Sequence, residues 1–263
     1  MTTRSTSDRR VALVMAGSKG LGRGCAEALA RTGHAVVIGA RGSEALDETV
    51  NMVKGLGVPA VGVLADVSGS EGVERLTAAA LNGFGRLDVL IANAGGPPPG
   101  RFGELDDDDW RAGFDLTFMS TVRALRRCVP VMTAAGFGRV VVIGSSSVRV
   151  PLPDLVLSNA FRPALHGVIA SLAPEVIADG VTVNMVAPGR IDTDRVRVTM
   201  QRSAERAGID EAEARRRSEA GVPAGRWGTL AELGALVAFL ASDEAGYITG
   251  QVIGVDGGLV NCL

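Results

Sequence analysis

Short apolar runs recur along the chain, separated by longer stretches in which apolar residues return every three or four positions. The runs are rich in valine, isoleucine and leucine and pass into glycine, asparagine, serine or proline, a pattern typical of strands buried on both faces. Seven strands are predicted: VALVMAG (residues 11–17), AVVIGA (35–40), AVGVLADV (60–67), LDVLIANAG (87–95), GRVVVIGSSS (138–147), VTVNMVAPG (181–189) and QVIGVDGG (251–258).

The stretches between these strands have the period of amphipathic helices. Helices are predicted at residues 25–33, 43–57, 72–85, about 107–132 and 164–177. Continuous apolar strands separated by helices predict a parallel sheet covered on both faces. We therefore predict an α/β fold: a Rossmann-type, doubly wound parallel sheet of about seven strands with helices on both faces, a three-layer α/β/α arrangement. Ligands are expected at the carboxyl ends of its strands.

All 263 residues are predicted to form one domain, because no Pro/Ser-rich or highly charged linker divides the chain. Residues 1–10 are polar and are interpreted as a flexible tail. Residues 194–224 are charged and leave directly from the carboxyl end of a predicted strand. We interpret them as a substrate lid, the alternative being a solvated helical excursion.

The composition narrows the class of partner. The formal net charge is −2 and the basic residues are scattered, so a small molecule is expected to bind, and neither nucleic acid nor a membrane surface. No run reaches the roughly 18 apolar residues of a membrane span, and no apolar leader follows the polar start, so we expect a cytoplasmic protein. Cys25, Cys128 and Cys262 lie far apart in sequence, which favours buried thiols over disulfides or a metal site.

A glycine-rich turn, AGSKGLGRG (16–24), follows the first strand and opens a helix. Glycines there let the backbone approach a pyrophosphate, and the helix N-terminus supplies amide N–H groups and partial positive charge. Arg41 ends the second strand, where a site that prefers NAD usually carries an acid. Together with Lys19 it suits a 2′-phosphate, so NADP(H) is preferred over NAD(H), the alternative being two solvated cations.

Two further strand ends carry polar residues suited to a nucleotide. Asp66 is placed to bond an adenine amine, although it also reads as a simple turn residue, and Asn93 can tie neighbouring strands together. The predicted cofactor-binding residues of these four regions are Gly17, Ser18, Lys19, Gly20, Leu21, Gly22, Arg41, Asp66, Val67, Asn93, Ala94 and Gly95.

In its ordered motifs the chain resembles the short-chain dehydrogenase/reductase family over residues 11–259. The matching segments are GLG in the glycine turn, DVS, NAG, VVVIGSSS, VNMVAPGRIDT, the region GRWGTLAELGALVAFLAS and ITGQVIGVDGG. The resemblance implies that Pro188, Gly189, Ile191 and Thr193 line the nicotinamide. It also implies a dimer or tetramer built on the helices at 107–132 and 164–177 and on the C-terminal strand. The family's first glycine is replaced by Ala16, which is expected to crowd the turn.

The family's catalytic residues are asparagine, serine, tyrosine and lysine, and three of these types are substituted here. Ser145 matches the serine. The family spacing of twelve intervening residues leads from Ser145 to Ser158 in place of the tyrosine, and three more lead to Arg162 in place of the lysine. Thr117 stands at the asparagine position, seven residues after Trp110. These four residues are the predicted catalytic set, and Arg162 is also expected to hold the nicotinamide ribose.

Ser158 and Arg162 are four residues apart, so on a helix they project on one face. A serine hydroxyl is a far weaker acid than a phenol, whose pKa is about 10. The serine side chain is also shorter, so its oxygen does not extend as far into the site as a tyrosine oxygen would. Water or substrate must therefore fill the gap and relay the proton. Pro163 is expected to break the helix here, unless the helix starts late or kinks.

Four other residues are weighed as site candidates. Asp154, on the loop entering the site, reads better as a solvated turn residue than as a catalyst. His166 reads better as a core or interface residue. Arg190 and Asp192 flank the nicotinamide loop. They could contact an anionic or enolic substrate, the alternative being that they form a surface ion pair.

Three functions remain open. The preferred one is an NADP(H)-dependent oxidoreductase acting on a small carbonyl or alcohol, with Ser145 orienting the oxygen and an altered proton donor near Ser158. The second is a redox-neutral isomerase, dehydratase or cyclase on the same scaffold. The third is a non-catalytic, nucleotide-binding partner subunit, because a fold alone does not decide function.

Overall fold

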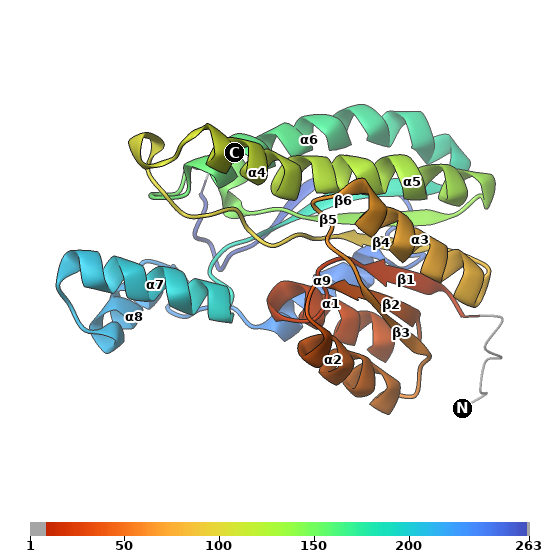
Figure 1. Cartoon of the computed structure of the whole chain (residues 1–263), viewed down its shortest axis with the longest axis horizontal. Coiled ribbons are helices and arrows are strands. Elements are labelled where there is room, and N and C mark those ends of the chain that lie inside the picture. The colour runs from red at the N-terminus through yellow and green to blue at the C-terminus, as the bar shows by residue number, and fades with distance from the viewer. Residues whose placement is uncertain (1–8, 262–263) are drawn as a thin grey trace.

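A computed structural model describes residues 9–261, without the side chain of Ser203. Its sheet has seven strands in the order β3-β2-β1-β4-β5-β6-β7, and each neighbouring pair is parallel (Figure 1). The strands are β1 Val11–Val14, β2 Ala35–Ala40, β3 Ala60–Leu64, β4 Val89–Ala92, β5 Gly138–Ile143, β6 Val181–Pro188 and β7 Val252–Val255. The order reverses at β1, which makes the sheet doubly wound and confirms the predicted fold.

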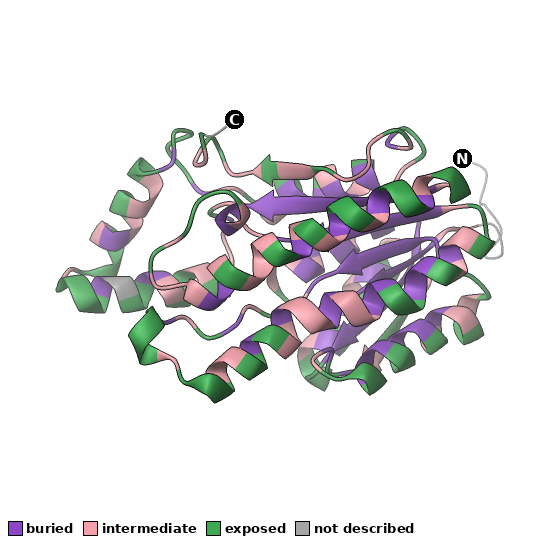
Figure 2. Ribbon diagram, turned by 90° about the horizontal axis from the view of Figure 1, so that it is seen from above, coloured by how far each residue is buried: buried purple, intermediate pink, exposed green. Residues whose placement is uncertain are grey.

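Helices cover both faces of the sheet (Figure 1). One layer contains α3 Ser70–Phe84, α4 Asp107–Phe114, α5 Ser120–Ala134 and α6 Val156–Val176. The other contains α1 Gly20–Arg31, α2 Ser43–Gly55 and α9 Leu230–Leu240. Alternate residues of a strand point to opposite faces, so Leu13 packs in the core under the first layer and Val14 in the core under the second. The strands at the centre of the sheet are buried throughout (Figure 2).

The long helix predicted near residues 107–132 is interrupted by one turn of a different helix. Residues Asp115–Met119 form a π-helical turn between α4 and α5. Such a turn inserts an extra residue, and single π turns are frequent at functional sites. Thr117 lies in the middle of it.

The helix α6 continues through Pro163, so the interruption expected from the sequence does not occur. Proline inside a helix removes one backbone hydrogen bond and costs about 3 kcal/mol. Contacts on either side hold the backbone in place. The Asn159 amide accepts from the Leu152 N–H at 3.0 Å and donates to the Leu152 carbonyl at 2.8 Å, while Arg162 bonds to two carbonyls at the end of β5.

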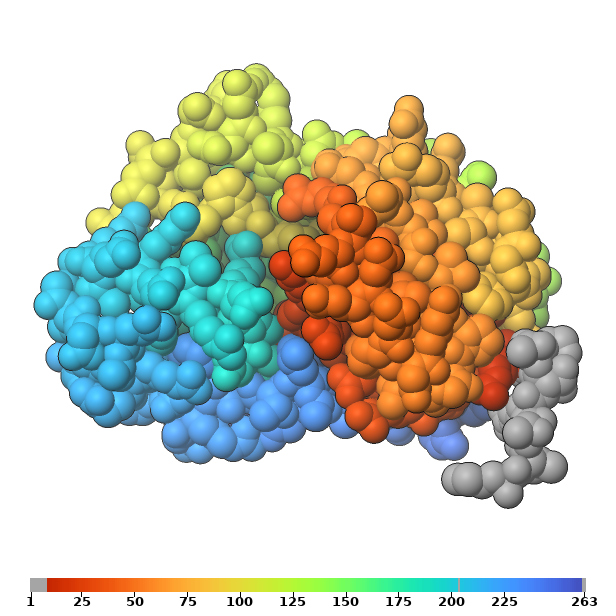
Figure 3. Space-filling view, turned by 60° about the horizontal axis from the view of Figure 1, so that its bottom comes forward, coloured from red at the N-terminus to blue at the C-terminus, as the bar shows by residue number. Residues whose placement is uncertain are grey.

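The predicted lid segment forms two helices, α7 Asp194–Ala207 and α8 Glu211–Ala220. Met200, Ala204, Ala214 and Trp227 form a small buried cluster of their own in this part of the chain. In the space-filling view the blue-green helices lie beside the red and orange N-terminal half, and the surface is hollowed where they meet (Figure 3). The role of this segment as a lid stays a prediction, as do the single domain and the oligomer.

Shorter turns complete the described chain: η2 Phe102–Glu104, η4 Ser146–Val148 and η5 Ile177–Asp179. Within residues 9–261 we find no helix with the length and apolar content that a bilayer crossing requires. Those residues likewise contain no cluster of side chains that could hold a metal ion. Cys25 and Cys128 are buried free thiols, and burial raises the pKa of Cys25 to about 12. Cys262 and nearly all of the predicted tail lie outside the described residues.

Candidate active site

A cavity of about 1090 Å³ opens at the carboxyl ends of the strands. Its wall is built from the turns after β1, β2, β3, β4, β5 and β6 and from the start of α7. Parallel strands end at one edge of the sheet, so turns far apart in sequence meet there. The volume lies just above the usual range for ligand pockets, about 300–1,000 Å³, which suits a large ligand or two ligands side by side.

Most residues predicted for the site line this cavity together. They are Ser18, Lys19, Gly20, Leu21, Arg41, Asp66, Val67, Asn93, Ala94, Gly95, Ser145, Ser158, Arg162, Pro188, Gly189, Ile191 and Thr193. The wall formed by the described residues does not include Gly17, Gly22 or Thr117.

Gly17 and Gly22 shape the turn from behind. A β-carbon at Gly22 would lie 2.3 Å from the Ala16 carbonyl oxygen, and one at Gly17 would lie 2.8 Å from the Ile38 side chain. Both close approaches require glycine. Lys19 is the residue preceding α1 and its side chain makes no capping bond, so the first N–H groups of that helix are left to face an anion.

Ala16 adopts a left-handed backbone conformation, with φ at +45°. A side chain disfavours that region by roughly 1–2 kcal/mol, so the alanine is strained where the family carries glycine. The expected crowding of the turn therefore takes the form of backbone strain.

Ala16→Gly is expected to raise the free energy of unfolding by about 1 kcal/mol, because relief of strain exceeds the added entropy of the unfolded chain. Urea titration measures it. Ala78→Gly, the same change at an exposed position of α3, should lower stability by about 1 kcal/mol. Loss of stability in both variants would contradict the strain.

Asn93 and Asp66 occupy the ends of β4 and β3. The Asn93 amide donates to the carbonyls of Met15 and Ala16, both at 3.2 Å, and so ties β4 to the turn after β1 as predicted. Asp66 accepts from the N–H and the hydroxyl of Ser68 at 2.9 and 2.7 Å. These bonds, with a smaller contribution from Arg41, lower the pKa of Asp66, so it is an acceptor at neutral pH.

Ser145, Ser158 and Arg162 meet at one wall of the cavity. The Ser145 hydroxyl accepts the Ser147 N–H at 3.1 Å. Arg162 donates from Nε to the Ser158 hydroxyl at 3.1 Å, and from Nη1 to the carbonyls of Ile143 and Gly144 at 2.8 and 2.9 Å. The same arginine therefore clamps α6 to the end of β5 and polarises Ser158. Its Nη2 group has no partner among the described residues.

Burial and, to a smaller extent, the nearby charge of Arg195 lower the pKa of Arg162 to about 10. Arg162 remains a cation at neutral pH.

Ser158 lines the cavity although only 7% of its surface is exposed.

Thr117 lies away from this wall. It is 3% exposed, and its buried hydroxyl has no hydrogen-bond partner among the described residues. An unsatisfied buried hydroxyl costs about 1–3 kcal/mol. The π turn therefore contains a buried polar group without a partner, and no described contact joins it to Ser145, Ser158 or Arg162.

Comparisons with known proteins agree with this geometry. The family model described as "Enoyl-(Acyl carrier protein) reductase" matches residues 15–260. Dehydrogenase/reductase SDR family member 4 of Bos taurus is 34% identical over 100% of this chain and 91% of its own length. The chain belongs to the short-chain dehydrogenase/reductase family.

Two other similar proteins are named as reductases. The 3-oxoacyl-[acyl-carrier-protein] reductase FabG of Haemophilus influenzae is 36% identical, over 95% of this chain and 98% of its own. The L-sorbose reductase of Gluconobacter frateurii, solved with NADPH and L-sorbose, is 31% identical, with a TM-score of 0.91 over 97% of this chain and 98% of that one. The chain is accordingly a short-chain oxidoreductase.

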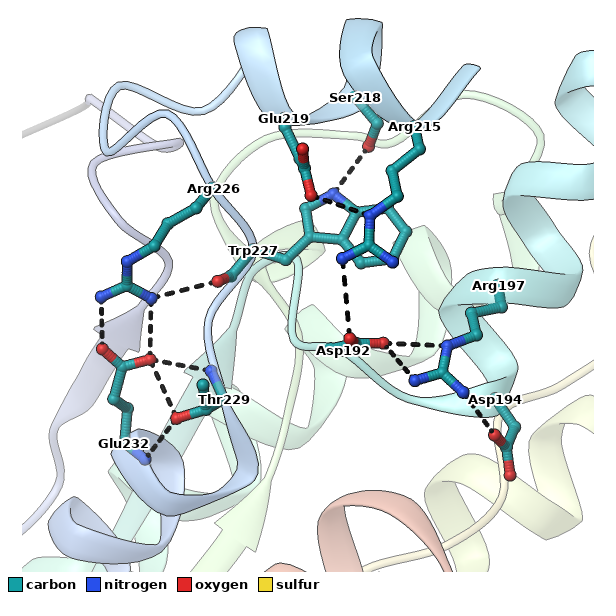
Figure 4. A network of polar contacts seen from close by, with 10 residues as sticks. All are labelled: Asp192, Asp194, Arg197, Arg215, Ser218, Glu219, Arg226, Trp227, Thr229 and Glu232. Atoms are coloured by element: carbon teal, nitrogen blue, oxygen red, sulfur yellow. Dashed lines mark hydrogen bonds and ion pairs between the residues drawn. The ribbon is translucent and has the colours of Figure 1, made fainter. Parts of the chain in front are cut away.

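The other candidates fall at the edge of the short-chain dehydrogenase/reductase site. Asp154 lines the cavity but pairs with Arg101 at 2.8 Å and Arg206 at 3.0 Å, and these bonds lower its pKa. Asp192 pairs with Arg197 at 2.8 Å and Arg215 at 3.7 Å, in a network that joins α7 and α8 to Trp227 (Figure 4). Arg190 lines the cavity, and His166 is outside its described wall.

Arg195 is one of several cavity residues that were not predicted as site residues from the sequence. Arg195, at the start of α7, lines the same cavity and donates to the carbonyls of Gly96 and Pro97 at 3.0 and 2.9 Å. The available signal was its place two residues after Thr193, at the point where the predicted lid leaves the nicotinamide loop.

Proposed function

We propose that this protein is an NADP(H)-dependent reductase or dehydrogenase of a small carbonyl or alcohol, with Ser158 and Arg162 in place of the usual proton donor. The observation that carries the proposal is the meeting of Ser145, Ser158 and Arg162 at one wall of the cavity that also contains the glycine turn. Relatives of this chain include NADPH-dependent reductases, such as the L-sorbose reductase.

The residues present fit a dinucleotide. The turn after β1 has Gly20 at a positive φ, a close approach at Gly22 and an α1 N-terminus without a side-chain cap. Lys19, Arg41 and Asp66 line the same end of the cavity. A bound nicotinamide cofactor would supply the hydride donor or acceptor. Thr193, whose hydroxyl accepts the Val196 N–H at 3.3 Å, lines the cavity with Ile191 and lies beside the glycine turn, where a β-carbon on Gly20 would be 3.6 Å from its side chain.

Ser145 is suited to orient the substrate oxygen. Because its hydroxyl oxygen already accepts the Ser147 N–H, its hydrogen is free to donate to a carbonyl in the cavity. A donor fixed in this way stabilises negative charge that develops on that oxygen.

Arg162 and Ser158 act as a pair. Since Arg162 donates to the Ser158 oxygen, the serine hydrogen must turn to another acceptor, and a water in the cavity is the simplest one. That water gives one of its own protons to the substrate oxygen, and the hydroxide that remains takes a proton from the solvent, so Ser158 keeps its hydrogen and only positions the water. The cation of Arg162 stabilises the developing charge, and its Nη2 group stays available for the ribose hydroxyls.

Arg41→Ser is expected to weaken NADPH binding about 10- to 100-fold, the value of a hydrogen bond to a charged group, and to leave NADH binding unchanged. Fluorescence titration measures both affinities. The control, Arg31→Ser, removes a cation that pairs with Glu27 at 2.7 Å on the surface of α1. Equal losses for the two cofactors would argue against a 2′-phosphate contact.

The activity itself is tested by titrating the protein with NADPH and then following nicotinamide absorbance with a panel of small ketones and aldehydes. We expect saturable binding and loss of absorbance. Tight binding without turnover would favour the redox-neutral enzyme or the partner subunit. Absence of binding would contradict every function that uses the cofactor.

A further inference from the structure

Four arginines border the cavity without a salt bridge among the described residues: Arg41, Arg162, Arg190 and Arg195. Arg41 lies near Asp66, on the side of the glycine turn. Arg162 and Arg195 instead donate to backbone carbonyls, so no described carboxylate pairs with either cation.

Arg195 is held in place across the cavity. It comes from the first turn of α7, and both of its Nη atoms donate to carbonyls of the loop after β4. Its guanidinium packs against Gly96, where a β-carbon would be 2.2 Å from the arginine Cζ. The described residues supply only these two acceptors to the guanidinium, which has five N–H groups.

The surrounding protein disfavours this concentration of charge. Burial lowers the pKa of Arg190 and of Arg195, and Arg195 in turn lowers the pKa of Arg162. Of these cations, Arg162 and Arg195 are close enough for their charges to repel, and an anion bound beside them removes that repulsion.

The phosphates of a dinucleotide have other partners. They are expected at the N-terminus of α1, next to Lys19 and Arg41 on the β1 and β2 side of the sheet. Arg195 contacts the loop after β4 and Arg162 contacts the end of β5, further along the strand order. These two cations line the same cavity as Ser145, where the substrate oxygen is placed by the proposed function.

We propose that the carbonyl substrate carries a carboxylate, which Arg195 binds. A carboxylate is planar and matches the guanidinium fork with two parallel hydrogen bonds. This inference rests on the proposed function for the position of the reacting carbonyl. It adds the substrate class, an oxo acid, and assigns a binding role to the start of the candidate lid.

The test compares oxo acids with their methyl esters, which keep the ketone and the carbon chain and differ in charge. Pyruvate, acetoacetate and levulinate, each with its ester, are titrated by calorimetry into protein saturated with NADP⁺, which cannot reduce them. At least one acid is expected to bind about tenfold or more tightly than its ester, the effect of one charge-assisted hydrogen bond. Equal affinity within every pair, including no binding of either member, would overturn the inference.

Variants locate the effect. Arg195→Leu should reduce the acid-to-ester ratio of affinities about tenfold or more, and Arg195→Lys should restore part of it. Arg216→Leu is the matched control, because Arg216 lies on α8 outside the cavity wall described above and shares Glu213 with Arg217. A weaker affinity for NADPH in Arg195→Leu, with an unchanged ratio, would assign the cation to the cofactor and overturn the inference.

Failure of the inference and failure of the proposed function give different results. If esters and acids are reduced equally well, the reductase stands and the carboxylate site does not. If acids bind through Arg195 but no ketone is reduced, the anion site stands and the redox activity does not.

Discussion

Arg162→Met is expected to lower kcat/KM for carbonyl reduction by about 100-fold or more, because one substitution removes the bond to Ser158 and the cation beside the reacting oxygen. Methionine keeps much of the length of the side chain, so α6 stays packed. Steady-state rates with NADPH and a ketone that the protein reduces give the measurement, and thermal unfolding verifies that the variant is folded.

The pH profile separates a chemical role of Arg162 from a structural one. With its pKa lowered to about 10 by burial, the charged form is complete at neutral pH and is lost as pH rises through about 10. The rate of the unmodified protein should fall there, and that inflection should be missing in Arg162→Met. Arg149→Met is the control, since Arg149 is exposed and also bonds a carbonyl, that of Val252 at 2.9 Å. Similar rates in Arg162→Met and Arg149→Met would contradict the chemical role of Arg162.

The fold was predictable because its strands are buried on both faces. A run such as residues 140–143 is apolar throughout and has no polar alternation, and the structure pairs the strand that contains it in parallel with β4 and β6. Once the strands are known, their carboxyl ends must meet at one edge of the sheet. That is why residues as distant as Lys19, Asp66 and Thr193 were expected together and line one cavity.

The remaining features of the site could not be predicted, because they depend on tertiary contacts that leave no local pattern in the sequence. The reach of Arg195 to Gly96 requires α7 to sit over the loop after β4, and nothing in the period of either segment specifies that. The continuous helix at Pro163 is a case of packing overriding propensity, because Asn159 and Arg162 fix the backbone on both sides. At Ala16 the sequence predicted only that the turn would be crowded, and the structure shows a left-handed backbone conformation there.

Restoring the usual pair with Ser158→Tyr and Arg162→Lys is expected to raise kcat/KM for simple ketones by about 100-fold, the lower end of the range for general acid catalysis. Ser158 opens onto the cavity, so a phenol at this position extends toward the substrate oxygen. Its pKa of about 10 can be tuned by the neighbouring lysine. The measurement is the rate of NADPH oxidation with a neutral ketone such as cyclohexanone.

The two changes should depend on each other. In Ser158→Tyr alone, Arg162 stays clamped to the carbonyls of Ile143 and Gly144 and cannot move to follow the phenol, so the single variant should gain less than the double one. Adding Ser145→Ala to the double variant should remove most of the gain, because the oxygen is then no longer oriented. If the folded double variant binds NADPH normally and reduces ketones no faster, positions 158 and 162 are not where the proton is delivered.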